Sequence, residues 1–251
     1  MEFLKHDIGD KNFLRYIIRF LKSGIIENLK YYESDKGTPQ GGLISPVLAN
    51  VYLHYVLDLW FEKGIKPKLK GEAYLIRYCD DFIIMFQYEN EAQMVYVLLK
   101  ERLKKFKLEL AEDKTRILPF GRFKGSKESF DFLGFSHHNS KTRTGKYTIQ
   151  HKISKKKKKA KKQAIKQWLE QNMHVYLVDV MGRLNRKLIG MYAYYGLNGM
   201  YKDLLGIYKY TKYMLYKVMC RRSQKKIKVK KYRLILERIP IAKPQIYVQI
   251  W

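Results

Sequence analysis

Two adjacent carboxylates, Asp80 and Asp81, stand between two apolar runs at residues 73–78 and 82–86. Phosphoryl transfer assisted by two metal ions needs closely placed carboxylates on a rigid support, because they must hold Mg²⁺ against the substrate phosphates. Neighbouring residues of a strand point to opposite faces, so only a turn can bring both carboxylates to one metal cluster. We therefore expect unequal roles, with Asp80 as the stronger candidate. An isolated Asp–Asp pair is more often an ordinary acidic turn, so the surrounding elements must decide.

The residues around this pair predict a strand, a turn and a second strand. Asn90 is expected to cap a following helix, and residues 107–111 and 114–118 are expected to form two short strands. Interleaved strands and helices with short connections favour an α+β fold with an antiparallel sheet over a parallel, doubly wound one.

A glycine-rich loop at residues 37–42, with the sequence GTPQGG, precedes this unit. Its glycines and proline break both regular helix and central strand. Ser45 and Pro46 are expected to form the N-cap and first turn of a long apolar helix that runs toward Phe61. Upstream of the loop, apolar spacing predicts another helix over residues 11–23. A simple turn with a helix cap is the plain interpretation of the loop, although its glycines would let a nucleotide approach the backbone closely.

The composition is strongly basic: 51 Lys and Arg against 23 Asp and Glu leave a net charge of +28. Such a charge attracts polyanions, so nucleic acid is the first expected partner. No apolar run approaches the roughly 20 residues that spanning a membrane requires, and no signal peptide is recognisable, so no membrane partner is expected. Cys79 and Cys220 lie far apart and in no metal-ligand spacing, which argues against a disulfide framework or a zinc site. A reducing, cytoplasmic setting is therefore expected.

The composition changes near His151, and we predict a domain boundary there, between residues 1–150 and a helical domain at residues 151–251. Apolar residues beyond the boundary recur at helical spacing and predict a helical bundle. The second domain opens with a basic run, and the repulsion among its ammonium groups favours a polyphosphate partner over a merely solvated face. The run contains Lys155, Lys156, Lys157, Lys158, Lys159, Lys161 and Lys162.

Four motifs, in order, resemble those of reverse transcriptases of the group II intron type. They are GTPQGGLISPVLAN at residues 37–50, YCDD at 78–81, EDKT at 112–115 and FLGF at 132–135. The resemblance implies a polymerase palm in which Asp80 and Asp81 are catalytic and bind Mg²⁺, with two ions in the complete site. It also implies that an RNA template and an RNA/DNA hybrid are bound.

The same resemblance suggests roles for residues outside the acidic pair. Gln40 and Gly41 would lie near the incoming nucleotide and the template, and Lys114 would lie near the leaving pyrophosphate. FLGF is expected to pack in the core, with Gly134 permitting close approach of the primer strand.

Residues 183–196, RLNRKLIGMYAYYG, resemble the α-helical thumb, or maturase, segment of group II intron proteins. The resemblance implies contact with intron RNA. Cations would contact phosphates, while aromatic rings would stack or hydrogen-bond to sugars and base edges. Ordinary core packing is expected for about half of these side chains. The candidate nucleic-acid-binding residues here are Arg183, Arg186, Lys187 and Tyr194.

The family draws a further catalytic aspartate from an upstream palm strand, and no matching strand is evident in this sequence. Asp7 and Asp10 sit beside a helix start, where capping is their expected role. The fingers also have no counterpart. We therefore expect an RNA-directed DNA polymerase fragment, inactive alone, that is either truncated or completed by a separate chain supplying the fingers and first aspartate. A non-catalytic, maturase-like module that binds RNA and assists intron splicing is the alternative, and a role in splicing, retromobility or defence is left open.

Overall fold

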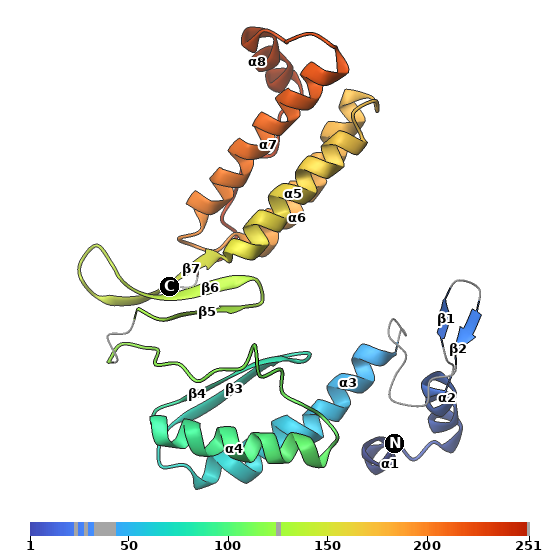
Figure 1. Ribbon diagram of the computed structural model, residues 1–251, viewed down its shortest axis with the longest axis vertical. Helices are drawn as coiled ribbons and strands as arrows, with labels where there is room; N and C mark the ends of the chain where they lie inside the picture. Colours follow the sequence, from blue (N-terminus) through green and yellow to red (C-terminus); the bar gives the residue numbers. More distant parts are fainter. Residues whose placement is uncertain (23–24, 28–29, 33–43, 124–126, 250–251) are drawn as a thin grey trace. The chain divides into compact units, whose positions relative to one another are not determined.

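The computed structural model describes residues 1–22, 25–27, 30–32, 44–123 and 127–249, and the chain divides into two compact units, Met1–Leu118 and Pro119–Trp251 (Figure 1). Both units contain helices and antiparallel strands. This arrangement confirms the predicted α+β fold. No helix of the described residues is both long and apolar enough to cross a membrane. The cytoplasmic setting stays a prediction.

The first unit begins with helices α1 (Glu2–Asp7) and α2 (Lys11–Leu21) and the short antiparallel strands β1 (Ile25–Glu27) and β2 (Lys30–Tyr32). The predicted helix near residues 11–23 is confirmed. Asp10 caps it, because its carboxylate accepts hydrogen bonds from the backbone N–H groups of Asn12 and Phe13, at 2.8 and 3.1 Å. Asp7 instead accepts a hydrogen bond from the Tyr55 hydroxyl, so the expected capping role holds for Asp10 only.

The long apolar helix predicted after the glycine loop is α3 (Ser45–Leu53), continued by the π-helical segments η1 (His54–Asp58) and η2 (Trp60–Ile65) and a 3₁₀ turn, η3 (Lys66–Lys68). Pro46 lies in the first turn, as predicted. Ile44, not Ser45, occupies the N-cap position, so the predicted cap was one residue late. The wider π turns leave backbone carbonyls to satisfy, and Arg102 donates to those of Tyr55 and Val56 at 3.2 and 3.0 Å.

Strands β3 (Ala73–Tyr78) and β4 (Asp81–Phe86) form an antiparallel hairpin, followed by helix α4 (Glu89–Lys105). Tyr88 is the N-cap of α4, so the predicted cap at Asn90 was wrong and Asn90 lies in the first turn. The hairpin packs one face against two buried clusters of the helices. Those clusters contain Val56, Leu57, Phe61, Ile65, Ala73, Val95, Leu99 and Leu103.

The two short strands predicted at 107–111 and 114–118 do not form. Lys107 adopts a left-handed φ of 58°, and the N–H of Leu108 donates to the carbonyl of Leu103 at 2.9 Å, which ends α4 in a tight C-terminal turn. Leu108 and Leu110 then pack on the core cluster of α4. The alternation of apolar residues at 107–111 thus reflects an irregular segment with one side on the core, and not a strand of a sheet.

The second unit contains a three-stranded antiparallel sheet in the order β5 (Ser129–Phe132), β6 (Phe135–Lys141), β7 (Tyr147–Ile153). Helices α5 (Lys155–Gln171), α6 (Leu177–Tyr195), α7 (Tyr201–Arg222) and α8 (Val229–Arg238) follow, and α6 and α7 are those that helical spacing predicted. The packing divides the chain after Leu118, so this sheet belongs with the helices. Assignment of residues 1–150 to a palm and 151–251 to a thumb stays a prediction.

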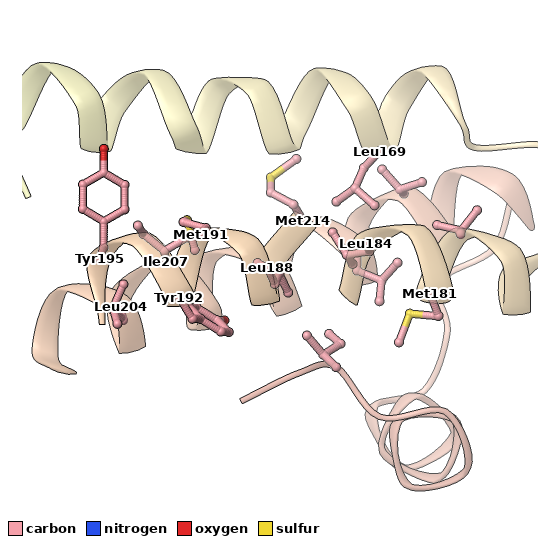
Figure 2. Packing of buried hydrophobic residues seen from close by; sticks show 14 of the residues in the cluster. Leu169, Met181, Leu184, Leu188, Met191, Tyr192, Tyr195, Leu204, Ile207 and Met214 are labelled. Carbon is pink, nitrogen blue, oxygen red and sulfur yellow. The ribbon is translucent and has the colours of Figure 1, made fainter. Parts of the chain in front are cut away.

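One continuous core holds the helices of the second unit together (Figure 2). It includes Leu184 and Leu188 of α6 and Leu204 and Ile207 of α7, each at most 1% exposed. Full burial of each such aliphatic side chain contributes about 1.5–3 kcal/mol. Ile153, the last residue of β7, is buried in the same core, and this contact ties the sheet to the bundle.

Candidate active site and nucleic-acid surface

The Asp80–Asp81 pair lies at the turn of the β3–β4 hairpin, as the sequence predicts. Tyr78 pairs with Asp81, so Cys79 and Asp80 alone form the turn. Cys79 takes a left-handed φ of 54°, a conformation that costs a non-glycine residue about 1–2 kcal/mol. Asp80 and Asp81 are both exposed. The hairpin therefore presents two adjacent carboxylates at its tip, one in the turn and one in a strand.

An arginine within β3 fixes the backbone of this turn. The guanidinium of Arg77 donates from Nε and Nη2 to the two carboxylate oxygens of Asp58, at 2.7 and 2.6 Å. Its Nη1 donates to the Asn50 side-chain oxygen at 2.7 Å and to the Cys79 carbonyl at 2.9 Å. We call Arg77, Asp58 and Asn50 the turn clamp, because they connect the turn to α3 and η1.

The electrostatics of the turn clamp keep the arginine charged. Hydrogen bonding to Asp58 raises the pKa of Arg77 despite partial burial. Sequence reasoning did not single out these three residues. The available signal was an arginine inside an apolar strand, since a charge that is partly buried needs a partner.

The two carboxylates suit a hydrated divalent cation. Mg²⁺ prefers oxygen ligands and commonly keeps several waters while binding one or two carboxylates. Within the described residues, no group of three His, Cys, Asp or Glu side chains could hold a metal ion, so the pair stands without a third such ligand.

The other expected nucleotide contacts are only partly visible. Gln40 and Gly41 lie outside the described residues. Lys114 is exposed in a turn in which its N–H donates to the Ala111 carbonyl at 2.9 Å. The carboxylate of neighbouring Glu112 pairs with Lys100 at 2.7 Å and not with Lys114. The Lys114 side chain therefore faces solvent.

The FLGF motif forms the turn between β5 and β6. Phe132 pairs with Phe135, and Leu133 and Gly134 occupy the turn with φ values of 50° and 83°. A Cβ on Gly134 would lie 2.9 Å from the Tyr195 hydroxyl oxygen, so glycine is needed for conformation and for space. The Tyr194 hydroxyl donates to the Leu133 carbonyl at 2.8 Å. The predicted core packing is confirmed for Phe135, which packs against the core of the second unit, whereas the approach of a primer strand stays a prediction.

The structure divides the lysine run on α5 into two groups. Ser154 caps the helix, and Lys158 forms a 2.6 Å salt bridge with Asp203 of α7. Lys162 places its ammonium 5.1 Å from the ring centre of Tyr210. Their partners lie within the fold, so these two lysines brace α5 against α7. The exposed members are Lys155, Lys156, Lys157, Lys159 and Lys161.

Helix α6 carries its candidate residues on the side away from the core. Arg183 and Arg186 are exposed. Lys187 is exposed and lies 5.3 Å from the ring centre of Trp168, while Tyr194 is 53% exposed. The opposite side, which includes Leu184 and Leu188, is buried. All four candidate side chains can therefore meet solvent or a ligand.

Comparison with known proteins decides the family. The family described as "Reverse transcriptase (RNA-dependent DNA polymerase)" matches residues 4–137, which include the acidic turn, the turn clamp and the FLGF motif. The chain belongs to the reverse transcriptase family.

Similar proteins place this reverse transcriptase chain beside intron-encoded members. It is 31% identical over 170 residues to the group II intron-encoded protein LtrA of Lactococcus lactis subsp. cremoris, covering 44% of this chain and 28% of that protein. It is 40% identical over 71 residues to a putative COX1/OXI3 intron 1 protein of Saccharomyces cerevisiae, covering 28% of this chain and 8% of the yeast protein. The chain thus matches less than a third of the length of either relative. The predicted resemblance to group II intron reverse transcriptases is confirmed.

Proposed function

We propose that this chain is a palm-and-thumb portion of an RNA-directed DNA polymerase of the group II intron type. The observation that carries the proposal is the Asp80–Asp81 pair at a hairpin turn whose carbonyl is held by Arg77. A held turn satisfies the requirement for preorganised carboxylates, because catalysis by charge stabilisation depends on groups that need not reorganise during the reaction.

The proposed reaction joins the primer 3′ oxygen to the α-phosphorus of a nucleoside triphosphate and releases pyrophosphate. Mg²⁺, when bound, would neutralise developing charge and activate the 3′ hydroxyl. Asp80 and Asp81 would hold the ions, with Asp80 as the principal ligand. Lys114 would attract the leaving pyrophosphate. The turn clamp would hold the turn backbone, and with it both carboxylates, in one position relative to the substrate.

A complete site requires groups beyond those described. Two Mg²⁺ ions would need more oxygen ligands than two carboxylates supply, and no third acidic or histidine ligand joins Asp80 and Asp81 among the described residues. We propose that another segment or a separate chain provides a further carboxylate and the nucleotide-binding fingers.

Primer extension on an RNA template tests this proposal. The chain alone should incorporate no nucleotide, and addition of a segment that carries the fingers and the further carboxylate should restore synthesis. Asp80→Asn should then abolish synthesis, because an amide lacks the carboxylate charge. Glu101→Gln changes an exposed carboxylate of the same unit that lies outside the four motifs, so it is the matched control and should remain active. Full activity of the Asp80→Asn protein would reject the assignment.

A second candidate function is RNA binding that assists intron folding without catalysis. The observation in its favour is the exposed basic surface of α5 and α6, which requires no metal site. Structured intron-like RNA should bind more tightly than a scrambled RNA of equal length at matched salt, because charge alone cannot distinguish equal numbers of phosphates. Equal affinities would remove this candidate.

A further inference from the structure

A groove runs between α5 and α7, and the residues that line its hollow are not among the candidate residues above. The two helices lie side by side and run in the same direction (Figure 1). Three side-chain contacts follow one another in the same order along both helices. They are Lys158 with Asp203, Lys162 with Tyr210, and Glu170 with Arg221.

The walls of the groove come from regularly spaced side chains. Tyr210, Tyr213, Lys217 and Arg221 recur every three or four residues on α7, so they form one stripe along its surface. From Tyr210 to Arg221 the stripe extends about 16 Å, at about 1.5 Å per residue. Opposite them, α5 contributes Lys166 and Glu170 to a hollow of about 300 Å³ whose floor includes the buried Met214 and Val218.

The groove carries a surplus of positive charge. Lys166, Lys217 and Arg221 line it against one carboxylate, Glu170, which Arg221 already neutralises at 3.1 Å. In the part of the chain that the structure describes, neither Lys166 nor Lys217 forms a salt bridge. Two uncompensated ammonium groups therefore face the same hollow.

Aromatic rings stand beside these cations. Tyr213 is 52% exposed, and the Lys217 ammonium lies 4.9 Å from the centre of its ring. Deeper in the groove, Tyr210 has the Lys162 ammonium 5.1 Å from its ring centre. Alternating rings and cations match the two parts of a nucleotide, since bases stack on exposed rings and phosphates pair with ammonium groups.

We propose that the α5–α7 groove binds a segment of unpaired RNA, with a base stacked on Tyr213 and the adjoining phosphates held by Lys166 and Lys217. The inference rests on the proposed function of the chain as an RNA-binding protein. Unpaired RNA is favoured over duplex because bases within a helix are stacked on one another and cannot reach a protein ring.

Fluorescence anisotropy with two labelled RNAs tests the stacking part. The probes are an oligouridine of about 12 nucleotides, within the usual range of single-strand site sizes, and an RNA duplex with the same number of phosphates. Tyr213→Ala should weaken oligouridine binding about tenfold, as loss of one stacked base would do. It should leave duplex binding unchanged. Tyr213→Phe should retain oligouridine affinity because it keeps the ring.

Matched controls separate stacking from loss of a tyrosine or of structure. Tyr201→Ala removes a comparably exposed tyrosine, 49% exposed, from the start of the same helix and should not change oligouridine affinity. Circular dichroism melts of both alanine proteins should coincide with the wild type. Equal losses for Tyr213→Ala and Tyr201→Ala, or equal losses on oligouridine and duplex, would overturn the proposal.

The charges are tested by the salt dependence of oligouridine affinity. Lys166→Gln combined with Lys217→Gln should reduce the slope of log affinity against log salt by about 1.4, at about 0.7 per single-strand phosphate contact. Lys226→Gln combined with Lys230→Gln removes the same charge from exposed positions elsewhere and should reduce the slope by much less. If the two double variants have the same slope of log affinity against log salt, binding depends on net charge alone, and the proposed RNA site in the groove is wrong.

Further results distinguish failure of the groove from failure of the proposed function. Loss of binding only when Arg183 and Arg186 are replaced would refute the groove and leave RNA binding by the chain intact. Absence of RNA binding by the wild type would refute both. Displacement of oligouridine by polyglutamate at equal charge concentration would indicate an acidic-peptide site, and would also overturn the proposal.

Discussion

Arg77 and Asp58 form a bidentate salt bridge in which Nε and Nη2 meet the two carboxylate oxygens at 2.7 and 2.6 Å. Both side chains are substantially buried, at 12% and 26% exposed. The same guanidinium donates to the carbonyl of Cys79, so this ion pair connects a π-helical segment with the turn that carries Asp80. The ion pair therefore connects the packed helices of the first unit with the turn that carries the candidate catalytic aspartates.

Asp58→Asn should destabilise the first unit by about 1–3 kcal/mol, because the change leaves a partly buried guanidinium without its charged partner. Hydrogen exchange of the β3 and β4 amides should accelerate correspondingly. Glu62→Gln breaks the exposed Glu62–Lys66 pair and should cost less than about 0.5 kcal/mol. Similar exchange rates in the two variants would show that the turn clamp does not stabilise the hairpin.

Cys79→Gly should stabilise the hairpin by up to about 1 kcal/mol, because glycine adopts a φ of 54° without a steric cost. Cys79→Val should destabilise it, since a β-branched residue tolerates this conformation poorly. Cys79→Ala is the control that removes the thiol while retaining a Cβ, and it should stay near the wild type. Urea unfolding would rank the three proteins, and a valine variant at least as stable as the glycine variant would contradict the argument.

Gly134→Ala should destabilise the second unit by about 1–3 kcal/mol, because a Cβ would meet the Tyr195 hydroxyl at 2.9 Å in a turn with φ of 83°. Gly182→Ala is a matched control within α6, where nothing lies within 4 Å of the added carbon. That change should stabilise by up to about 1 kcal/mol, as alanine does in helix interiors. Thermal unfolding should move the two variants in opposite directions, and a neutral Gly134→Ala would refute the steric reason.

His137 should make the second unit less stable as the pH falls. Burial, followed by the charge of His151, lowers the pKa of His137 to about 4, from an ordinary value of about 6.5. Asp131 opposes this shift and His138 adds to it. Between about pH 6.5 and pH 4 the unfolded chain binds more protons at this ring, so stability is full above pH 6.5 and falls through that window.

His137→Phe should reduce this pH dependence while retaining the stacked contact with Phe130, whose ring centre lies 4.8 Å away. The measurement is the difference between urea unfolding midpoints at pH 7 and pH 5, in wild type and variant. Comparing the two proteins cancels the titration of carboxylates common to both. An unchanged difference would assign the pH dependence to other groups.

Replacing the exposed lysines of α5 should weaken RNA binding without affecting the fold. Glutamine at Lys155, Lys156, Lys159 and Lys161 should flatten the salt slope for single-stranded RNA by up to about 2.8, at about 0.7 per phosphate contact. Lys158→Gln should instead lower the unfolding temperature, because it breaks the 2.6 Å pair with Asp203. If the four exposed lysines and Lys158 all affect only RNA binding, or all affect only stability, the lysine run is not divided into a binding group and a structural group.

Features of this protein that depend on near neighbours follow from the order of its amino acids alone. The two short apolar runs on either side of Asp80 and Asp81 predict a hairpin with those acids at its tip, because such runs separated by a polar turn are typical of paired strands. Asp10 ahead of an apolar helical pattern specifies a cap. The helices that contain Leu184 and Leu204 follow from apolar spacing, and the motif order indicated the family.

Which side chains meet across long intervals of sequence depends on how the chain packs in three dimensions. In the sequence Lys158 does not differ from the neighbouring lysines, but in the structure it pairs with Asp203, 45 residues away. Arg77 likewise holds the turn because it is itself bound by Asp58, 19 residues away. Residues 107–111 and 114–118 carry strand-like patterns but form no strand, because Leu108 and Leu110 pack on a helical core and residues 112–114 form a turn. Burial and charge pairing depend on packing between distant segments, so a local pattern can identify candidates without identifying their partners.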